Sequence, residues 1–139
     1  MHAVLISAHI LVLGSMFAAA AQSDLTASWI WAAGERVANY NDTIEARKTF
    51  DAPECAAAII RITADSYYRL YVNGEWVGDG PSRSWPEHYQ YDVIDVTSHV
   101  KPGKNEIRVI AKFFGIGTFH QLPVKAGLIA QLDMKDSAG

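Results

Sequence analysis

One stretch of this chain combines residue types that can bind a ligand with a spacing that would display them. It runs over residues 78–86 (GDGPSRSWP) and sets Arg83 and Trp85 among small residues. The face of an aromatic ring can stack on a sugar ring, and Arg or Asp side chains can hydrogen-bond hydroxyl groups. The sequence therefore indicates a carbohydrate-binding loop, with Trp85, Arg83, Trp76, Tyr89 and Asp79 as candidate binding residues.

The same aromatic residues have a structural interpretation, in which they cover the end of a folded domain or pack against a neighbouring domain. Both interpretations stay open for the loop. For Trp29 and Trp31 the pattern favours packing, because residues i and i+2 of a strand lie on one face.

Five carboxylates are candidates for acid–base chemistry: Asp65, Asp79, Glu87, Asp92 and Asp95. Hydrolysis of a glycosidic bond requires two carboxyl groups that face each other across the sugar. No spacing singles out such a pair, and aspartates near a turn commonly accept hydrogen bonds from backbone amides. The sequence therefore favours structural roles for these side chains and predicts no catalytic residue.

No metal or cofactor motif is present in the sequence. His88, His99 and His120 lack the spacing of a metal site. Cys55 is the only cysteine, so an intrachain disulfide and a cysteine-based zinc site are both excluded. We expect Cys55 to be a small buried apolar residue, and we expect no metal ion and no cofactor.

Length and charge limit the class of protein further. The chain has 139 residues, of which half are apolar, and a net charge of −3. This length fits one domain, and the apolar content is too high for a disordered chain. The negative charge argues against nucleic acid as a partner, since few phosphates would be neutralised.

Residues 1–21 have the layout of a secretory signal peptide. An apolar run leads into a stretch of alanines that allows cleavage after Ala20 or Ala21, and no Asp, Glu, Lys or Arg occurs before Asp24. An uncleaved membrane anchor and an N-terminal helix of the domain are the alternatives. We therefore expect a secreted or periplasmic domain at residues 22–139, with no membrane contact after cleavage.

The rest of the chain has the pattern of strands. An Asn73-Gly74 pair predicts a tight hairpin, and Pro102-Gly103 marks a second turn. One turn of helix is predicted over residues 95–100, with Asp95 or Thr97 as its cap. Strands are predicted over residues 29–31, 43–50, 57–64, 67–72, 75–77, 106–113 and 128–134. The predicted fold is all-β, an antiparallel sandwich or jelly roll.

Several short sequence motifs follow one another in a characteristic order: WIW at 29–31, RKTF at 47–50, ADSYYRLYVNG at 64–74, GDGPSRSW at 78–85, DVT at 95–97, PGKN at 102–105, GTF at 117–119 and GLIAQL at 127–132. Together they resemble the N-terminal β-domain of bacterial α-L-rhamnosidases of glycoside hydrolase family 78. The combination carries the resemblance, since LYVNG and DVT alone also occur in sugar-binding jelly rolls of other glycosidases. It covers the chain from Trp29 to Leu132.

The resemblance implies a galactose-binding-like sandwich that lies beside a catalytic (α/α) barrel. In that family the barrel hydrolyses terminal α-L-rhamnose, and its acid and base match no residue of this chain. The chain therefore looks like a fragment without the barrel, an accessory and non-catalytic domain of a secreted enzyme. A rhamnose-containing glycan is the implied ligand. The alternatives are a stand-alone carbohydrate-binding module and a structural or interaction domain without sugar affinity.

Overall fold

The computed structural model describes residues 25–32, 40–85, 87–119, 122 and 125–137. The leader predicted over residues 1–21 lies outside these ranges, and so does His120. Within the described residues, no helix is long and apolar enough to span a membrane. The elements in chain order are β1 (Asp42–Ala52), β2 (Cys55–Asp65), β3 (Tyr67–Val72), β4 (Glu75–Gly80), β5 (Asp92–Asp95), the 3-10 helix η1 (Thr97–His99), β6 (Gly103–Phe113) and β7 (Gly127–Asp136).

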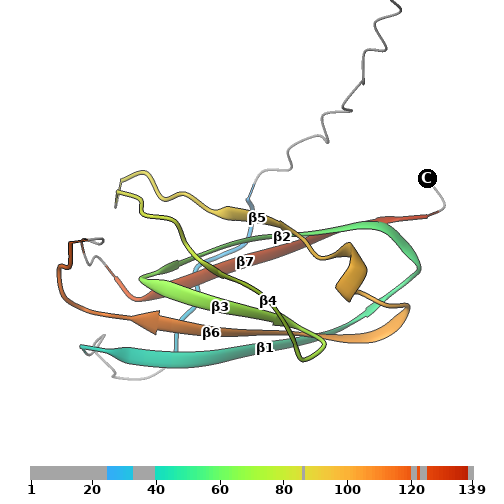
Figure 1. Cartoon of the computed structure of the whole chain (residues 1–139), viewed down its shortest axis with the longest axis horizontal. Helices are drawn as coiled ribbons and strands as arrows, with labels where there is room; N and C mark the ends of the chain where they lie inside the picture. Colours follow the sequence, from blue (N-terminus) through green and yellow to red (C-terminus); the bar gives the residue numbers. More distant parts are fainter. Residues whose placement is uncertain (1–24, 33–39, 86, 120–121, 123–124, 138–139) are drawn as a thin grey trace, which may run out of the picture.

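The strands form two antiparallel sheets that face each other, so the predicted all-β sandwich is confirmed (Figure 1). The larger sheet has the order β1-β6-β3-β4, and the smaller sheet has the order β5-β2-β7. Every strand pair is antiparallel, including those between strands far apart in the sequence, such as β1 with β6 and β2 with β7. The edges are therefore β1 and β4 in one sheet and β5 and β7 in the other.

The core fills the space between the two sheets. Alternate residues of β2, such as Ile60 and Ile62, face Tyr68, Leu70 and other buried side chains of the larger sheet. The alternation predicted for these strands is thus confirmed, because one face of each sheet must leave water. Burial of a large aliphatic or aromatic side chain contributes about 1.5–3 kcal/mol, so this layer is the main stabilising feature of the domain.

The two predicted turns are held together by a pair of asparagines. Asn73 and Gly74 both have positive φ, 50° and 83°, and Val72 pairs with Glu75 across them. This is the two-residue hairpin that the Asn-Gly pair predicts. The Asn73 side chain donates to the Asn105 side chain at 2.8 Å and accepts from the Glu106 amide at 2.9 Å. Asn105 is 1% exposed, and its side-chain amide exchanges two hydrogen bonds with the backbone of Lys101. The two motifs therefore have a structural role.

The strands are longer than the sequence indicated, and one strand was missed. Residues 78–80, predicted to begin the binding loop, continue β4 and pair with Tyr68–Leu70 of β3. Asp92–Asp95 form β5, which pairs with Ile59–Ile62 of β2. Ladder pairing with β3 holds the Gly-Asp-Gly residues of β4 extended despite their weak strand propensity, whereas the four residues of β5 are too few to show an alternating pattern by themselves.

The short helical elements and Cys55 agree in part with expectation. The predicted turn of helix exists as η1, and the Asp95 carboxylate accepts hydrogen bonds from the Thr97 amide and hydroxyl at 2.9 and 2.6 Å. Formally the N-cap position is Val96, so Asp95 acts through a side-chain turn one residue earlier. Cys55 is half-buried, packs against the core and forms no disulfide.

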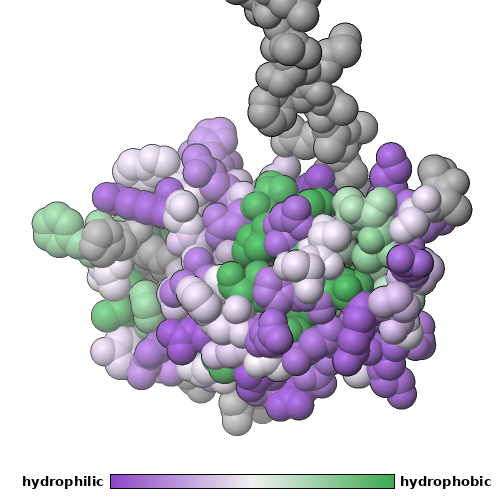
Figure 2. All heavy atoms as spheres, turned by 45° about the vertical axis from the view of Figure 1, so that its right-hand side comes forward, coloured by the Kyte–Doolittle hydropathy of each residue, from purple (hydrophilic) through white to green (hydrophobic). Residues whose placement is uncertain are grey.

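The surface is mixed in character. Figure 2 shows a group of apolar residues near the middle of one face, surrounded by hydrophilic side chains. Exposed apolar side chains occur on several elements, among them Val93, Met134 and Phe119. Scattered apolar residues are normal on a folded domain, so only those that line a depression deserve a functional interpretation.

Candidate functional site

The first part of the loop predicted to bind carbohydrate belongs to β4, and only its second part is a loop. Residues 81–85 leave the end of β4, and the Trp85 carbonyl accepts a hydrogen bond from the His88 amide at 2.9 Å. Trp85 is 63% exposed, and the guanidinium carbon of Arg83 lies 6.0 Å from the centre of its ring. That distance is at the outer limit of a cation–π contact. Arg83 and Trp85 are thus displayed next to each other on the surface.

Trp76 and Asp79 are not part of that group. Trp76 pairs with Tyr71 beside the hairpin turn, whereas Gly80, where the loop begins, pairs with Tyr68 at the other end of β3. At about 3.3 Å per residue, Trp76 and Gly80 lie roughly 13 Å apart along β4. Asp79 is exposed and accepts a hydrogen bond from the Tyr67 hydroxyl. The structure therefore does not assemble one platform from all five candidates.

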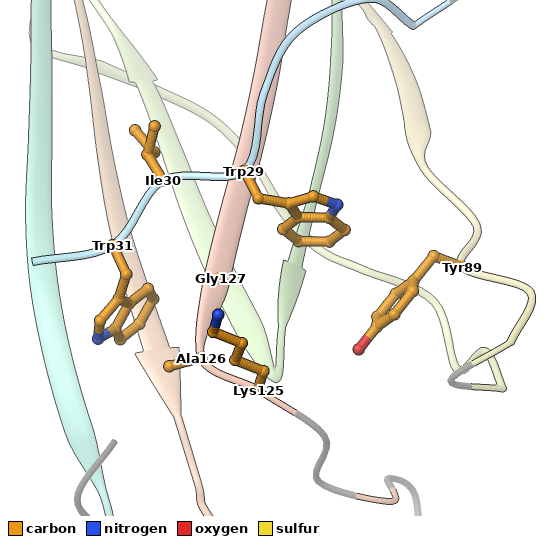
Figure 3. Close-up of a pocket in the computed structure, with 7 residues that line it drawn as sticks. All are labelled: Trp29, Ile30, Trp31, Tyr89, Lys125, Ala126 and Gly127. Atoms are coloured by element: carbon orange, nitrogen blue, oxygen red, sulfur yellow. The ribbon is translucent and has the colours of Figure 1, made fainter. Parts of the chain in front are cut away.

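Tyr89, the fifth candidate, belongs to a different site (Figure 3). Its ring forms one wall of an open pocket of about 410 Å³. Segments far apart in the sequence meet there, and we call it the aromatic pocket: Trp29, Ile30, Trp31, Tyr89, Lys125, Ala126 and Gly127. A volume above about 300 Å³ is typical of sites for small molecules.

The first wall of the aromatic pocket comes from a strap, residues 25–32, that crosses one end of the sandwich. Ile30 and Leu128 exchange two backbone hydrogen bonds of 2.8 and 2.9 Å, which tie the strap to β7. Upstream, the Gln131 side chain accepts from the Thr26 amide at 2.8 Å. In Figure 3 the rings of Trp29 and Trp31 lie on the same side of the strap, while Ile30 points the other way. The predicted shared face of the two tryptophans is therefore confirmed.

The two tryptophans differ in burial. Trp31 packs on Phe113 of the core with ring centres 6.4 Å apart, and its indole nitrogen donates to Asp42 at 3.3 Å. Trp29 is 47% exposed and meets Tyr89 edge-on, with ring centres 5.2 Å apart. The packing role expected for both tryptophans is thus right for Trp31 and incomplete for Trp29, which keeps part of its ring open to solvent.

A glycine sets the position of Trp29. A Cβ atom added to Gly127 would lie 2.7 Å from Cε3 of the Trp29 ring, which is closer than side chains approach each other. The indole therefore rests directly on the backbone of β7, between Gly127 and Tyr89. A ring held on two sides loses little freedom when a ligand binds, which favours affinity.

Tyr89 is partly buried and bonds the buried Asp65. Asp65 is 4% exposed, and the Tyr89 hydroxyl donates to its carboxylate at 3.4 Å. Burial and then the charge of Asp65 raise the pKa of Tyr89 to about 12, so the phenol stays neutral near pH 7. Because the phenol proton points at Asp65, the lone pairs of the same oxygen remain available to accept a hydrogen bond. Lys125 adds an exposed amino group that can donate.

Most of the carboxylates considered for catalysis accept hydrogen bonds from nearby hydroxyl or backbone groups. Asp92 accepts from the buried Tyr68 hydroxyl at 2.5 Å, and burial followed by that bond raises the pKa of Tyr68. The Asp95 pKa is lowered by its two bonds from Thr97. Glu87 is exposed. Among the described residues, none that lines the aromatic pocket is a carboxylate. In the part of the chain that the structure describes, no three His, Cys, Asp or Glu side chains gather as a metal site would require.

The histidines behave as isolated side chains. His88 is exposed, and His99 lies 3.8 Å from the exposed Glu75 carboxylate near the hairpin turn. The described lining of the aromatic pocket offers groups for stacking and hydrogen bonds. Sequence reasoning missed Trp29, Lys125 and Gly127 as members of one site, because no local pattern brings these positions together.

Comparison with known families is consistent with this geometry. The family described as the α-L-rhamnosidase N-terminal domain matches residues 53–125, more than half of the chain. The chain belongs to this family. No curated protein matches it significantly.

Solved structures of rhamnosidases contain a similar domain. The GH78-family rhamnosidase of Bacillus sp. GL1 superposes on 78% of this chain with a TM-score of 0.74 and 43% identity. The α-L-rhamnosidase of Streptomyces avermitilis, solved in complex with L-rhamnose, superposes on 81% with a TM-score of 0.61 and 28% identity. This chain spans only 12% and 11% of those two proteins.

A lectin has the same fold. The lectin from Pleurotus ostreatus, solved in complex with GalNAc, superposes on 81% of this chain and 32% of its own length, with a TM-score of 0.59 and 27% identity. The galactose-binding-like type of sandwich expected from the sequence thus fits this likeness.

Proposed function

We propose that this chain serves as an accessory β-domain of an α-L-rhamnosidase and hydrolyses no glycoside by itself. The family match carries the proposal, since the matched domain is an eighth or less of the solved rhamnosidases. The chemistry supports it, because several acidic side chains already bond to a tyrosine or to the backbone. The catalytic (α/α) barrel is the partner domain that this role requires.

The test is an assay of the purified chain with p-nitrophenyl α-L-rhamnoside. We expect no p-nitrophenol above the level in buffer, while a full-length rhamnosidase in the same buffer releases it readily. Steady release by this chain, lost on mutation of an acidic residue, would reject the proposal.

Carbohydrate binding is the second candidate function. The aromatic pocket supports it, because an exposed indole, a neutral phenol and an amine can together hold a sugar ring and its hydroxyls. The likeness to a lectin and to a rhamnosidase, each solved with a sugar, points in the same direction. The exposed Arg83 and Trp85 pair is the alternative place, and Trp76 and Asp79 are the more distant members of that first hypothesis.

Calorimetry with L-rhamnose and with N-acetylgalactosamine distinguishes between the aromatic pocket and the Arg83–Trp85 loop as the binding site. If the aromatic pocket binds, Trp29→Ala weakens binding about tenfold or more, equivalent to about 1.4 kcal/mol, and Trp85→Ala does not. The reverse pattern would assign binding to the Arg83–Trp85 loop. Absence of heat with both sugars and with plant oligosaccharides would favour a structural or interaction domain.

We also infer that the domain is exported, on the pattern of residues 1–21 alone. Mass spectrometry of the protein from culture medium or periplasm should show a first residue of Ala21 or Gln22. A mature protein that keeps Met1 in the cytoplasm would contradict this.

A further inference from the structure

The outer face of the larger sheet, which is turned away from the core, combines aromatic and charged side chains (Figure 1). Because residues of a strand alternate between the two faces, Arg69 of β3 points outward while its neighbours Tyr68 and Leu70 are fully buried. Arg69 pairs with Asp79 of β4, and the next outward position of β3 pairs with Trp76. The two candidates that lie away from the Arg83–Trp85 loop therefore share this outer face.

Most charges of the outer face near β1 are paired with each other. Glu45 accepts a hydrogen bond from Arg47 at 2.5 Å and also lies 3.6 Å from Arg108, so two arginines share one carboxylate. Glu106 lies 3.8 Å from Arg47. Exposed ion pairs of this kind contribute about 0–1 kcal/mol each, so their effect on stability is small. They do, however, engage these carboxylates with β1 and β6.

Two cations of the outer face have no acidic partner. Among the described residues, neither Arg69 nor Lys112 forms an ion pair. Lys112 of β6 pairs with Tyr67, and Arg69 follows two residues after Tyr67 on β3. The two cations are therefore diagonal neighbours on one face, with backbones roughly 7–8 Å apart. Two like charges at this distance repel each other, and an anion between them would remove that cost.

Asp79 lies across from Arg69, but its hydrogen bond goes elsewhere. The Asp79 carboxylate accepts from the Tyr67 hydroxyl, and Arg69 donates to the oxygen of Tyr67 at 3.5 Å. Hydrogen bonding to Tyr67 and then to Tyr71 raises the pKa of Arg69, so the guanidinium is held in its charged form between two phenols. Other N–H groups of this exposed guanidinium stay available, and their planar fork fits a carboxylate.

Trp76 adds an aromatic surface beside this guanidinium. Its side chain is 59% exposed, and no ring or cation of the described residues lies against its indole. The neighbouring Tyr71 differs, because the guanidinium carbon of Arg108 lies 4.1 Å from the centre of its ring. An exposed indole can stack on a sugar ring while a nearby cation binds an acidic group of the same chain of sugars.

We propose that the outer face binds a polysaccharide of uronic acids, with one sugar carboxylate between Arg69 and Lys112 and a sugar ring stacked on Trp76. Charge complementarity identifies the occupant: the chain has a net charge of −3, so the two unpaired cations attract an anion at this place and not over the whole surface. A protein partner would require an apolar centre, whereas Ile110 is the one apolar side chain between Arg69 and β1 on this face. This site is separate from the aromatic pocket and does not rest on the proposed function.

Calorimetry of the purified chain with a short oligogalacturonate tests the proposal. The control ligand is the same oligomer with methyl-esterified carboxyl groups, which keeps the sugar rings and removes the charge. We expect the acid form to bind about tenfold or more tightly than the ester, with an affinity that falls as salt is added. Equal affinity for both forms would overturn the proposal. Absence of binding by the acid form would also overturn it and would favour a protein partner for this face.

Matched variants locate the binding site. Arg69→Gln should weaken binding of the acid form about tenfold, whereas Lys135→Gln, which removes the same charge from the exposed end of β7, should change it less than about twofold. Trp76→Ala should weaken binding several-fold, and Trp85→Ala, at a similarly exposed indole, should not. Equal losses within either pair would overturn the proposal. So would a loss with Trp29→Ala as large as that with Trp76→Ala, which would assign binding to the aromatic pocket.

Asp79 provides a test in the opposite direction. Asp79→Asn removes the negative charge across from Arg69 and keeps an acceptor for the Tyr67 hydroxyl. The acid form should therefore bind about twofold to fivefold more tightly to this variant, because the ligand no longer meets a like charge. Unchanged or weaker binding by a variant with the thermal midpoint of the wild type would overturn the placement of the sugar carboxylate beside Arg69.

Discussion

The two long sides of the sandwich are built differently, although both lie between the edge strands of the same two sheets. On the β4–β5 side, Ile94 of β5 lies against Gly78 of β4, with its Cδ1 atom 3.8 Å from the position of a Cβ there. The buried Tyr68 also bonds Asp92 across the sheets. On the β1–β7 side the strap joins the two sheets at one end, where Ile30 pairs with Leu128 of β7 and Trp31 bonds Asp42 of β1. Beside it lies an apolar groove of about 300 Å³, lined by residues of both sheets such as Phe50 and Leu132.

The difference teaches how a small domain closes its core. The β4–β5 side uses a glycine, Gly80, at the point where Asp92 of the other sheet approaches too closely for a side chain. The β1–β7 side has large residues at both edges and no such approach. The β4–β5 side is therefore closed by direct contact between strands of the two sheets, whereas the β1–β7 side is crossed by the strap at one end and keeps a groove beside it.

The largest expected effect on stability comes from adding a side chain at Gly80, on the closed β4–β5 side. A Cβ atom at Gly80 would lie 2.3 Å from Asp92 Oδ2 and 3.0 Å from the Tyr68 ring, so Gly80→Ala must displace the bond between them. We expect a loss of about 1–3 kcal/mol in the free energy of unfolding. The matched control is Gly78→Ala, whose new Cβ makes only ordinary contact and should be neutral or stabilising by about 0.5–1 kcal/mol. Denaturant titration measures both, and equal effects would contradict a close approach confined to Gly80.

The second largest effect on stability should come from removing the hydrogen bond between Tyr68 and Asp92. Tyr68→Phe removes the hydroxyl that serves the Asp92 carboxylate, and we expect a cost of about 1–2 kcal/mol because Asp92 is half-buried and partly regains water. Tyr67→Phe removes a similar bond to the exposed Asp79 and should stay within about 0.5 kcal/mol. If both variants unfold at the same denaturant concentration, the bond contributes nothing to closure.

A smaller effect should appear at alkaline pH. The pKa of Tyr89 is raised from 10.0 to about 12 in the folded protein, so between these values the unfolded chain loses the phenol proton first. Stability from this group is complete below pH 10 and is lost as the pH rises toward 12. The fall in unfolding free energy between about pH 8 and about pH 11 should be less steep in Tyr89→Phe than in the wild type. Equal slopes would show that folding does not raise the pKa of Tyr89.

The smallest effect should come from filling the open side. Ala130 faces the other sheet but is exposed at the apolar groove, so Ala130→Val adds two methyl groups without a clash. We expect a change within about 0.5 kcal/mol, in contrast to Gly80→Ala. A cost well above that range, seen by thermal or denaturant unfolding of the isolated chain, would mean that the groove is already filled.

Much of the fold was predictable because its signals are local. Asn73-Gly74 predicts a hairpin from two residues, and the alternation in β2 assigns Ile60 and Ile62 to the core without any knowledge of their partners. For the candidate site, the sequence predicted the kind of surface but not its members. It predicted an aromatic and polar binding surface around Trp85. Tyr89 instead lies in the aromatic pocket with Trp29 and Lys125. The end of β4 was mistaken for a loop, because glycines that permit close approach look the same in sequence as glycines that permit a turn.

The sequence by itself determined the strands, the hairpin and the family, since these depend on periodicity, turn chemistry and a series of motifs. Only the tertiary structure decided which residues form a site. Positions 29, 89 and 127 meet because the strap pairs with β7 and Gly127 leaves room for an indole, and both facts depend on contacts across about a hundred residues of chain. The open side was equally hidden, because a strand carries no local mark of whether its edge will be covered.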